Sequence, residues 1–384
     1  MSPPPPELTS EASRTVPTLP GERITSLDAI RGVAVLGILP MNVVGFALVS
    51  EAYFNVDAGG SRTWFDELVG GFGEIFIDGK FMGIFSALFG AGIVLFADRA
   101  AAKDAHPVRL SLWRNLLLLL IGVAHTLWWD GDILVVYAVC SPVLLVLRSA
   151  SPRLLAAVGM GLMLLPPLIA WPVQAAIPED GPGPAEYWTP GGEQIDAVGI
   201  YLLVWLVARA LGMMLIGIAL YRWGVLQGER APHLYRTMTR VGLAVGLPLA
   251  VAGFSVHATS GYAVDVAVIG DIPAVLAIVP MVIAYIGIIV RWNAGGDTAG
   301  RARIRSTGRM ALSNYLSQSV LGVTFFAVLG SDDVGRGWLA VFVLVVWALQ
   351  LWWSPLWLRH FRFGPVEWLW RVGTYRRMVP LRRS

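Results

Sequence analysis

Ten apolar runs divide the chain, and they constrain its fold more than any other feature of the sequence. A helix needs about 20 consecutive apolar residues to cross a bilayer. Only 14% of the 384 residues are charged, against about a quarter in a soluble domain. The sequence therefore predicts an all-α, polytopic membrane bundle of about ten transmembrane helices, and it excludes a soluble enzyme or a nucleic-acid-binding protein. The runs cover residues 29–50, 64–98, 110–129, 131–148, 153–173, 199–221, 238–257, 271–291, 309–330 and 337–358.

The run at residues 64–98 is too long for a single crossing. We expect it to begin as an interfacial or re-entrant helix and to turn near Asp78 and Gly79. The membrane crossing would then start at Lys80.

The distribution of Arg and Lys between the loops predicts the orientation. Cations follow the even-numbered runs, whereas the loops after the odd-numbered runs carry mostly Asp and Glu. Because cytoplasmic loops are enriched in Arg and Lys, both termini are predicted to be cytosolic. We expect a disordered cytosolic tail at residues 1–22, a transmembrane bundle at 23–358 and a basic cytosolic tail at 359–384. The predicted location is the inner (plasma) membrane, as a multi-pass protein.

Cysteine and histidine are too sparse for a metal centre. Cys140 is the only cysteine, and the five His are scattered singly. A disulfide framework and a multi-Cys metal site are therefore excluded, and no metal ligands are predicted. The expected partners are the lipid bilayer and a small-molecule substrate, with no nucleic acid. A homodimer remains an open alternative.

Arg209 lies about nine residues into an apolar run, near the expected centre of the bilayer. An Arg at that depth costs at least about 2.5–3.5 kcal/mol on insertion scales. We therefore expect it to face the interior of the bundle. Two interpretations stay open: a structural ion pair, with Glu74 or Asp78, or a site for a ligand's anionic group.

The first run carries three further polar residues. Asp28 and Arg31 are three apart and share one helical face. They either set the topology or bind a phosphate-bearing ligand from the cytosol, together with Arg309. Asn42 lies deeper, where it either hydrogen-bonds to a neighbouring helix or contacts a ligand.

His125 is close to two carboxylates, Asp130 and Asp132, in a tight turn. A His oriented by a carboxylate is the minimum equipment for general-base catalysis. The alternative is a packed, hydrogen-bonded structural His.

Two other groups of polar residues lie within apolar runs. Asp78 and Lys80 are at the expected outer edge, where Lys80 either extends toward the interface or contacts a ligand. Polar residues in the ninth run either form hydrogen bonds between helices or line a substrate path. This second group comprises Ser313, Asn314, Tyr315 and Gln318.

Five segments resemble the YeiB-type membrane proteins, a family of largely unknown function. They are residues 23–39, 79–92, 122–138, 308–319 and 361–371, and they extend over nearly the whole chain. The resemblance implies a C-terminal family domain at about 220–375. That family is distantly similar to transmembrane acyltransferases such as heparan-alpha-glucosaminide N-acetyltransferase. Their Asp-x-x-Arg-Gly pattern is matched by Asp28, Arg31 and Gly32.

The resemblance implies transfer of an acyl group from a cytosolic carrier to an extracytoplasmic acceptor. Acyl-CoA would be the donor substrate, with no permanently bound cofactor. The catalytic His of those enzymes lies near the second segment, where this chain has Asp78 and Lys80 instead. Two other functions stay open from the residues alone: a transporter or exporter of a small amphipathic or anionic metabolite, and a membrane scaffold.

Overall fold

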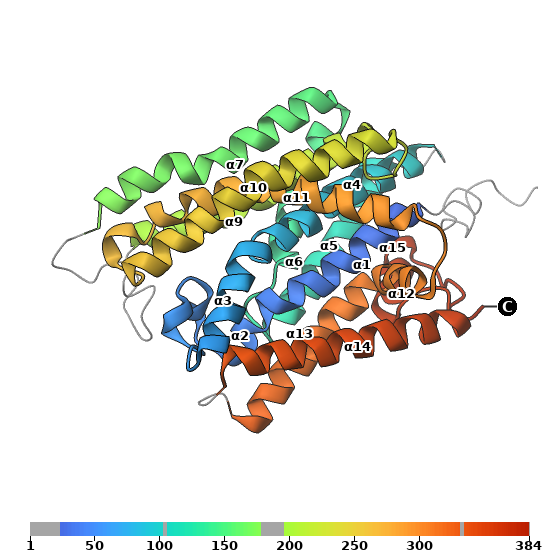
Figure 1. Ribbon diagram of the computed structural model, residues 1–384. Coiled ribbons are helices and arrows are strands. Elements are labelled where there is room, and N and C mark those ends of the chain that lie inside the picture. Colours follow the sequence, from blue (N-terminus) through green and yellow to red (C-terminus); the bar gives the residue numbers. More distant parts are fainter. Residues whose placement is uncertain (1–23, 103–105, 178–195, 331–333, 384) are drawn as a thin grey trace, which may run out of the picture.

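The computed structural model describes residues 24–102, 106–177, 196–330 and 334–383 (Figure 1). The predicted tail at 1–22 and most of the loop at 174–198 lie outside the described residues. Within these ranges the ordered elements are helical, apart from one isolated bridge between Phe361 and Arg382. The predicted all-α fold is confirmed.

Each of the ten apolar runs contains a helix, and two amphipathic helices lie before the ninth run and after the tenth. The α-helices are α1 (Thr25–Asn42), α2 (Val44–Ala47), α3 (Trp64–Phe76), α4 (Lys80–Ala101), α5 (Pro107–Thr126), α6 (Leu134–Val146), α7 (Pro152–Ala175), α9 (Asp196–Arg222), α10 (Pro232–Ser260), α11 (Ile272–Asn293), α12 (Ala299–Arg309), α13 (Ala311–Leu329), α14 (Arg336–His360) and α15 (Pro365–Tyr375).

Seven helical segments of the described chain are long and apolar enough to cross a membrane. The other three predicted crossings correspond to α1, α6 and α13. The apolar helix that includes α6 is shorter, ending at Ser149. Helix α1 contains Asp28 and Arg31 among its apolar residues, and α13 contains Asn314 and Gln318. The chain is a membrane protein with several transmembrane helices; ten crossings and cytosolic termini stay predictions.

The long run at residues 64–98 is divided as predicted. Helix α3 ends at Phe76 and α4 begins at Lys80. Gly79 between them has a φ of 71°, which glycine adopts without steric cost. Helix α3 is amphipathic and is capped by Thr63 and Asp66 in a reciprocal capping box. It exposes Trp64 and Phe72 on one side, as an interfacial helix does.

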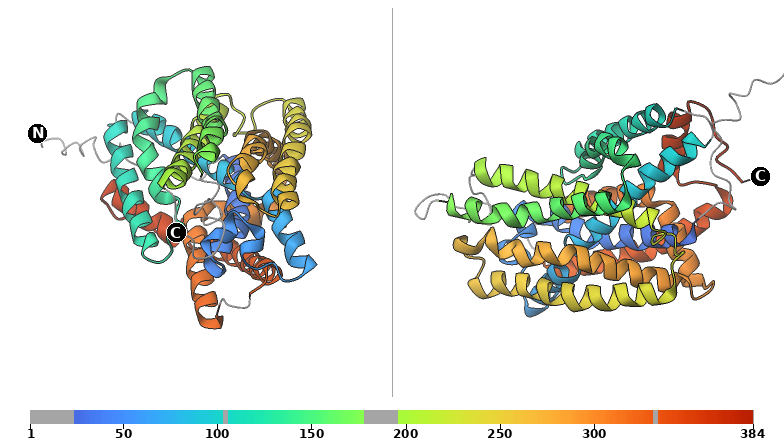
Figure 2. Two further views of the ribbon diagram at one scale, coloured as in Figure 1. Left: turned by 90° about the vertical axis from the view of Figure 1, so that its left-hand side faces the viewer. Right: turned by 90° about the horizontal axis from the view of Figure 1, so that it is seen from above.

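Small residues allow the central helices to approach closely. A Cβ on Gly217 of α9 would lie 2.0 Å from the carbonyl oxygen of Ala87 on α4. Likewise, a Cβ on Gly90 of α4 would lie 2.3 Å from the carbonyl oxygen of Met214 on α9. Such contacts are typical of helices packed within a membrane. Figure 2 shows the long helices running side by side.

The two ends of the bundle differ in structure. Helices α12 and α15 and the C-terminus lie at one end, and α3 lies at the other (Figure 1). In the predicted orientation the first end is cytosolic. The segment expected as a basic tail folds back there: Trp370 Nε1 donates to the Arg114 carbonyl at 2.9 Å, and Trp113 Nε1 donates to the Gly373 carbonyl at 2.9 Å.

The orientation is tested by labelling engineered thiols with a reagent that does not cross membranes. We expect Asp265→Cys, after α10, to react in intact cells, and Arg303→Cys, on α12, to react only after permeabilisation. Both positions are exposed, and the native Cys140 is buried. The reverse labelling pattern would contradict the predicted topology.

Candidate functional site

Two charged cavities lie in the core, toward opposite ends of the long helices. The first, of about 390 Å³, is here named the acidic cavity. It lies at the α3 end. Among its lining residues are five carboxylates and two cations: Glu74, Asp78, Asp130, Asp132, Asp271, Lys80 and Arg209. Asn42, Tyr53, His257 and Tyr315 also line it.

Arg209 faces this cavity, as the cost of its insertion predicted. Its side chain is buried, with 3% of its surface exposed, and its guanidinium carbon lies 3.7 Å from the centre of the Trp205 ring. The guanidinium stacks on this indole rather than pairing with Glu74 or Asp78. Its Nε has no hydrogen-bond partner among the described residues. A Cβ on Gly79 would lie 2.2 Å from an Arg209 terminal nitrogen, so glycine is required there.

Lys80 is also buried, so the expectation that it extends to the interface is wrong. Only 1% of its surface is exposed, and Nζ donates to the Glu74 carbonyl oxygen at 2.5 Å. The turn at Gly79 brings the start of α4 against the last turns of α3, which directs this side chain inward. Asp78 lines the same cavity.

The acidic cavity also contains Asp271 and His257, which were not predicted as part of a site, and Glu74, which was predicted only as a possible partner of Arg209. Asp271 accepts a hydrogen bond from Trp205 Nε1 at 3.1 Å, and Glu74 accepts one from the Tyr262 hydroxyl at 3.0 Å. His257 stacks on Tyr262, and its Nδ1 has no partner among the described residues. Spacing in the sequence could not associate Asp271 with Trp205, because they lie on different segments. The one signal available in the sequence was that Asp271 is a carboxylate at the start of the apolar run 271–291.

His125 and Asp132 form a buried pair. His125 Nδ1 lies 2.8 Å from Asp132 Oδ1, which also accepts a hydrogen bond from the Tyr315 hydroxyl at 3.2 Å. The Val135 backbone N–H donates to Asp132 Oδ2 at 3.1 Å. Asp132 and Tyr315 line the acidic cavity, whereas His125 lies behind them and Asp130 lines the cavity separately. The Nε2 atom of His125 is buried without a partner among the described residues.

The second cavity, of about 680 Å³, is here named the arginine cavity. It lies at the α15 end, and it brings together the predicted residues Asp28, Arg31 and Arg309. Six arginines face two carboxylates, so the cavity carries a positive charge. The Arg114 guanidinium is stacked between Phe96 and Trp370, 4.5 and 3.7 Å from the ring centres. The charged lining residues are Asp28, Arg31, Arg99, Arg114, Arg309, Arg362, Glu367 and Arg371.

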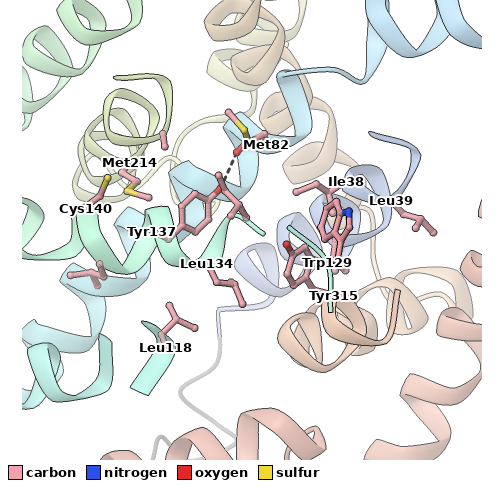
Figure 3. Close-up of a cluster of buried hydrophobic side chains, with 14 of the residues drawn as sticks. Ile38, Leu39, Met82, Leu118, Trp129, Leu134, Tyr137, Cys140, Met214 and Tyr315 are labelled. Atoms are coloured by element: carbon pink, nitrogen blue, oxygen red, sulfur yellow. Dashed lines mark hydrogen bonds between the residues drawn. The ribbon is translucent and has the colours of Figure 1, made fainter. Parts of the chain in front are cut away.

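An aromatic partition separates the two cavities. Met82 lines the acidic cavity, and Phe85, one turn further along α4, lines the arginine cavity. The Tyr137 hydroxyl forms a hydrogen bond with Ser86 Oγ at 2.8 Å. Figure 3 shows that it also points at the Met82 carbonyl. Phe85 packs against the Tyr137 and Tyr315 rings at 6.2 Å. A few side chains thus divide the interior.

The other polar residues of the ninth run connect helices, and none of them lines either cavity. Asn314 donates to the Ser354 hydroxyl at 3.1 Å, and Gln318 donates to the Gln350 side chain at 3.0 Å, so both hold α13 to α14. Ser313 donates to Glu367 of α15 at 2.5 Å.

Glu367 anchors the C-terminal helix to the core. Its carboxylate also accepts the backbone N–H groups of Leu312 and Ser313, at 2.7 and 3.1 Å. These bonds satisfy backbone N–H groups in the first turn of α13, whose N-cap residue makes no side-chain hydrogen bond. Burial raises the pKa of Glu367 above its usual range, and the hydrogen bonds from Ser313 partly offset this increase.

No group of three or more His, Cys, Asp or Glu side chains is arranged to hold a metal ion in the part of the chain that the structure describes.

The fold and the two cavities define a helical membrane protein with a divided, charged interior. Residues 220–377 match the family described as "Protein of unknown function (DUF418)". The chain belongs to this family, together with YeiB and its relatives.

The relatives are similar over almost their whole lengths. "Uncharacterized protein YeiB" of Escherichia coli (strain K12) is 34% identical, covering 94% of this chain and 98% of that protein. "Uncharacterized protein YxaH" of Bacillus subtilis (strain 168) is 29% identical, covering 96% and 98%. A 39.9 kDa protein of Bacillus acidopullulyticus is 26% identical, covering 94% and 96%. No solved structure matches this chain.

The role of Glu367 as an anchor is tested by Glu367→Ala. Loss of a cap and of hydrogen bonds to a charged group is expected to cost about 2–3 kcal/mol, seen as a lower thermal unfolding midpoint of the purified protein. Asp98→Ala, at an exposed acid of α4, is the control and should leave the midpoint nearly unchanged. An equal midpoint for both variants would exclude this role.

Proposed function

We propose that this protein is a membrane acyltransferase of the bacterial plasma membrane. It would move an acyl group from a cytosolic carrier such as acyl-CoA to an acceptor on the other side. The observation that carries the proposal is the pair of charged cavities on opposite sides of one thin partition. Two substrates can approach one point from opposite ends of such a bundle. The distant similarity to transmembrane acyltransferases supports the same activity.

The arginine cavity suits the donor. Its volume of about 680 Å³ falls within the range of about 300–1,000 Å³ that is typical of ligand pockets. Arginine guanidinium groups bind phosphates through bidentate, charge-assisted hydrogen bonds. Arg31, Arg114 and Arg309 would bind the phosphates of the carrier, and the apolar lining near Phe85 and Phe89 would accept the acyl chain.

The acidic cavity suits the acceptor. Asp132 faces this cavity, and its bond to His125 Nδ1 orients the imidazole. The free Nε2 would act as the general base that removes a proton from the acceptor. The nucleophile would then attack the thioester carbonyl carbon, the carbon–sulfur bond would break, and the carrier would leave as a thiol after taking up a proton. A small displacement of Tyr315 would be needed to bring the imidazole to the cavity, because His125 lies behind its wall.

Transport without covalent chemistry is the second function that a specific observation favours. The same two cavities, separated by only one turn of α4, would suit alternating access to a central site. In that case His125 and Asp132 would connect helices, and Arg209 would bind an anionic group of the cargo. Transfer of labelled acyl groups in proteoliposomes distinguishes the two, because a transporter leaves the donor thioester intact.

His125→Ala tests the catalytic step. We expect the variant to fold and to lose acyl transfer by about 10²–10⁴-fold, the usual contribution of a general base. Turnover is measured with labelled acyl-CoA and the membrane-embedded protein. His233→Ala, at an exposed His on α10, is the control. Unchanged turnover in a well-folded His125→Ala variant would exclude His125 from the mechanism.

Arg114→Gln tests the donor site. Loss of a charged contact to a phosphate is expected to raise the KM for acyl-CoA by about tenfold or more, with a smaller effect on kcat. Arg109→Gln is the matched control, because Arg109 is exposed on the same helix and does not line the cavity. A change in kcat alone would argue against a role in donor binding.

A further inference from the structure

The charges of the acidic cavity are divided between two regions. Lys80 and Arg209 lie at the start of α4 and on α9, whereas Asp130 and Asp132 lie in the turn between α5 and α6. Both regions, together with Tyr53, line this same cavity. A ligand in this cavity can therefore contact both.

The overall charge of the lining favours a ligand that bears an ammonium group. Five carboxyl groups line the cavity against two cations, so acidic groups outnumber basic ones in its lining. Burying charges of one sign is costly unless a partner compensates them. Both oxygens of Asp132 are already engaged, by His125 and Tyr315 on one side and by the Val135 N–H on the other. Asp130 is exposed and lines the cavity, so its carboxylate is the one in this turn that can receive an ammonium group.

Two buried nitrogen atoms in the same cavity lack partners. Arg209 Nε and His257 Nδ1 have none among the described residues, although 97% and 93% of the two side chains' surfaces are buried. A buried polar group without a partner is costly, and at a binding site a ligand supplies that partner. Because Trp205 fixes the plane of the Arg209 guanidinium, its free edge can accept a planar carboxylate.

We infer that the acidic cavity binds a small amino acid-like compound, with its ammonium group at Asp130 and its carboxylate at Arg209. This inference rests on the proposed function and names the acceptor class. The amine, after losing a proton to the His125 pair, would attack the thioester carbonyl. A carbon–nitrogen bond would form as the carbon–sulfur bond breaks. The products would be an amide, the free thiol of the carrier and one proton.

The test measures binding to the full-length protein in nanodiscs, without any acyl donor. Three probes share a short carbon chain: lysine, 1,5-diaminopentane, which lacks the carboxylate, and hexanoate, which lacks the amines. We expect lysine to bind at least tenfold more tightly than either of the others. Arg209→Gln should reduce lysine affinity about tenfold or more and leave diaminopentane affinity unchanged. Asp130→Asn should weaken both amines.

Arg62→Gln is the control, because Arg62 is exposed and does not line the cavity. Arg209→Lys preserves the charge and should retain part of the affinity if Arg209→Gln fails to fold. The inference is wrong if hexanoate binds as tightly as lysine, if Arg209→Gln weakens both amines equally, or if no probe binds below about 10 mM. Acyl transfer to other acceptors without lysine binding would refute this inference and leave the proposed function intact. Lysine binding without acyl transfer would support the amino acid site and refute the proposed function.

Discussion

The cost of holding a charge inside a membrane explains most of this structure. A charged side chain at the centre of a helix costs at least about 2.5–3.5 kcal/mol on insertion scales, so it must face protein, water or a ligand. Arg209 meets this constraint by stacking on Trp205, and Lys80 meets it by donating to the Glu74 carbonyl. Further charged side chains line the two cavities, and many large apolar side chains are exposed on the outer sides of the helices.

The division of these charges follows from the same constraint. Carboxylates outnumber cations in the lining of one cavity, and arginines outnumber carboxylates in the lining of the other. The partition at Tyr137 and Phe85 is aromatic and thin, which keeps the two charged interiors apart over one turn of α4. An acyl group is neutral and apolar, and it is the one part of an acyl donor that can reach this partition at low cost.

Much of the fold could be predicted from the sequence because apolar length and glycine have local signatures. The break at Gly79 and the inward direction of Arg209 were predicted correctly, each from its own segment. Asp271 and Glu367 could not be predicted as site residues, because their partners lie 66 and 54 residues away along the chain. Similarly, the short amphipathic helix α12 could not be predicted, because its four arginines are typical of a basic loop.

The most direct test of the account is a structure of the protein determined with a non-hydrolysable thioether analogue of acyl-CoA. The account predicts density in the arginine cavity, with phosphates against Arg31, Arg114 or Arg309 and the thioether sulfur at the aromatic partition. Density for the analogue in the acidic cavity, or an arginine cavity without density at a saturating concentration, would contradict it.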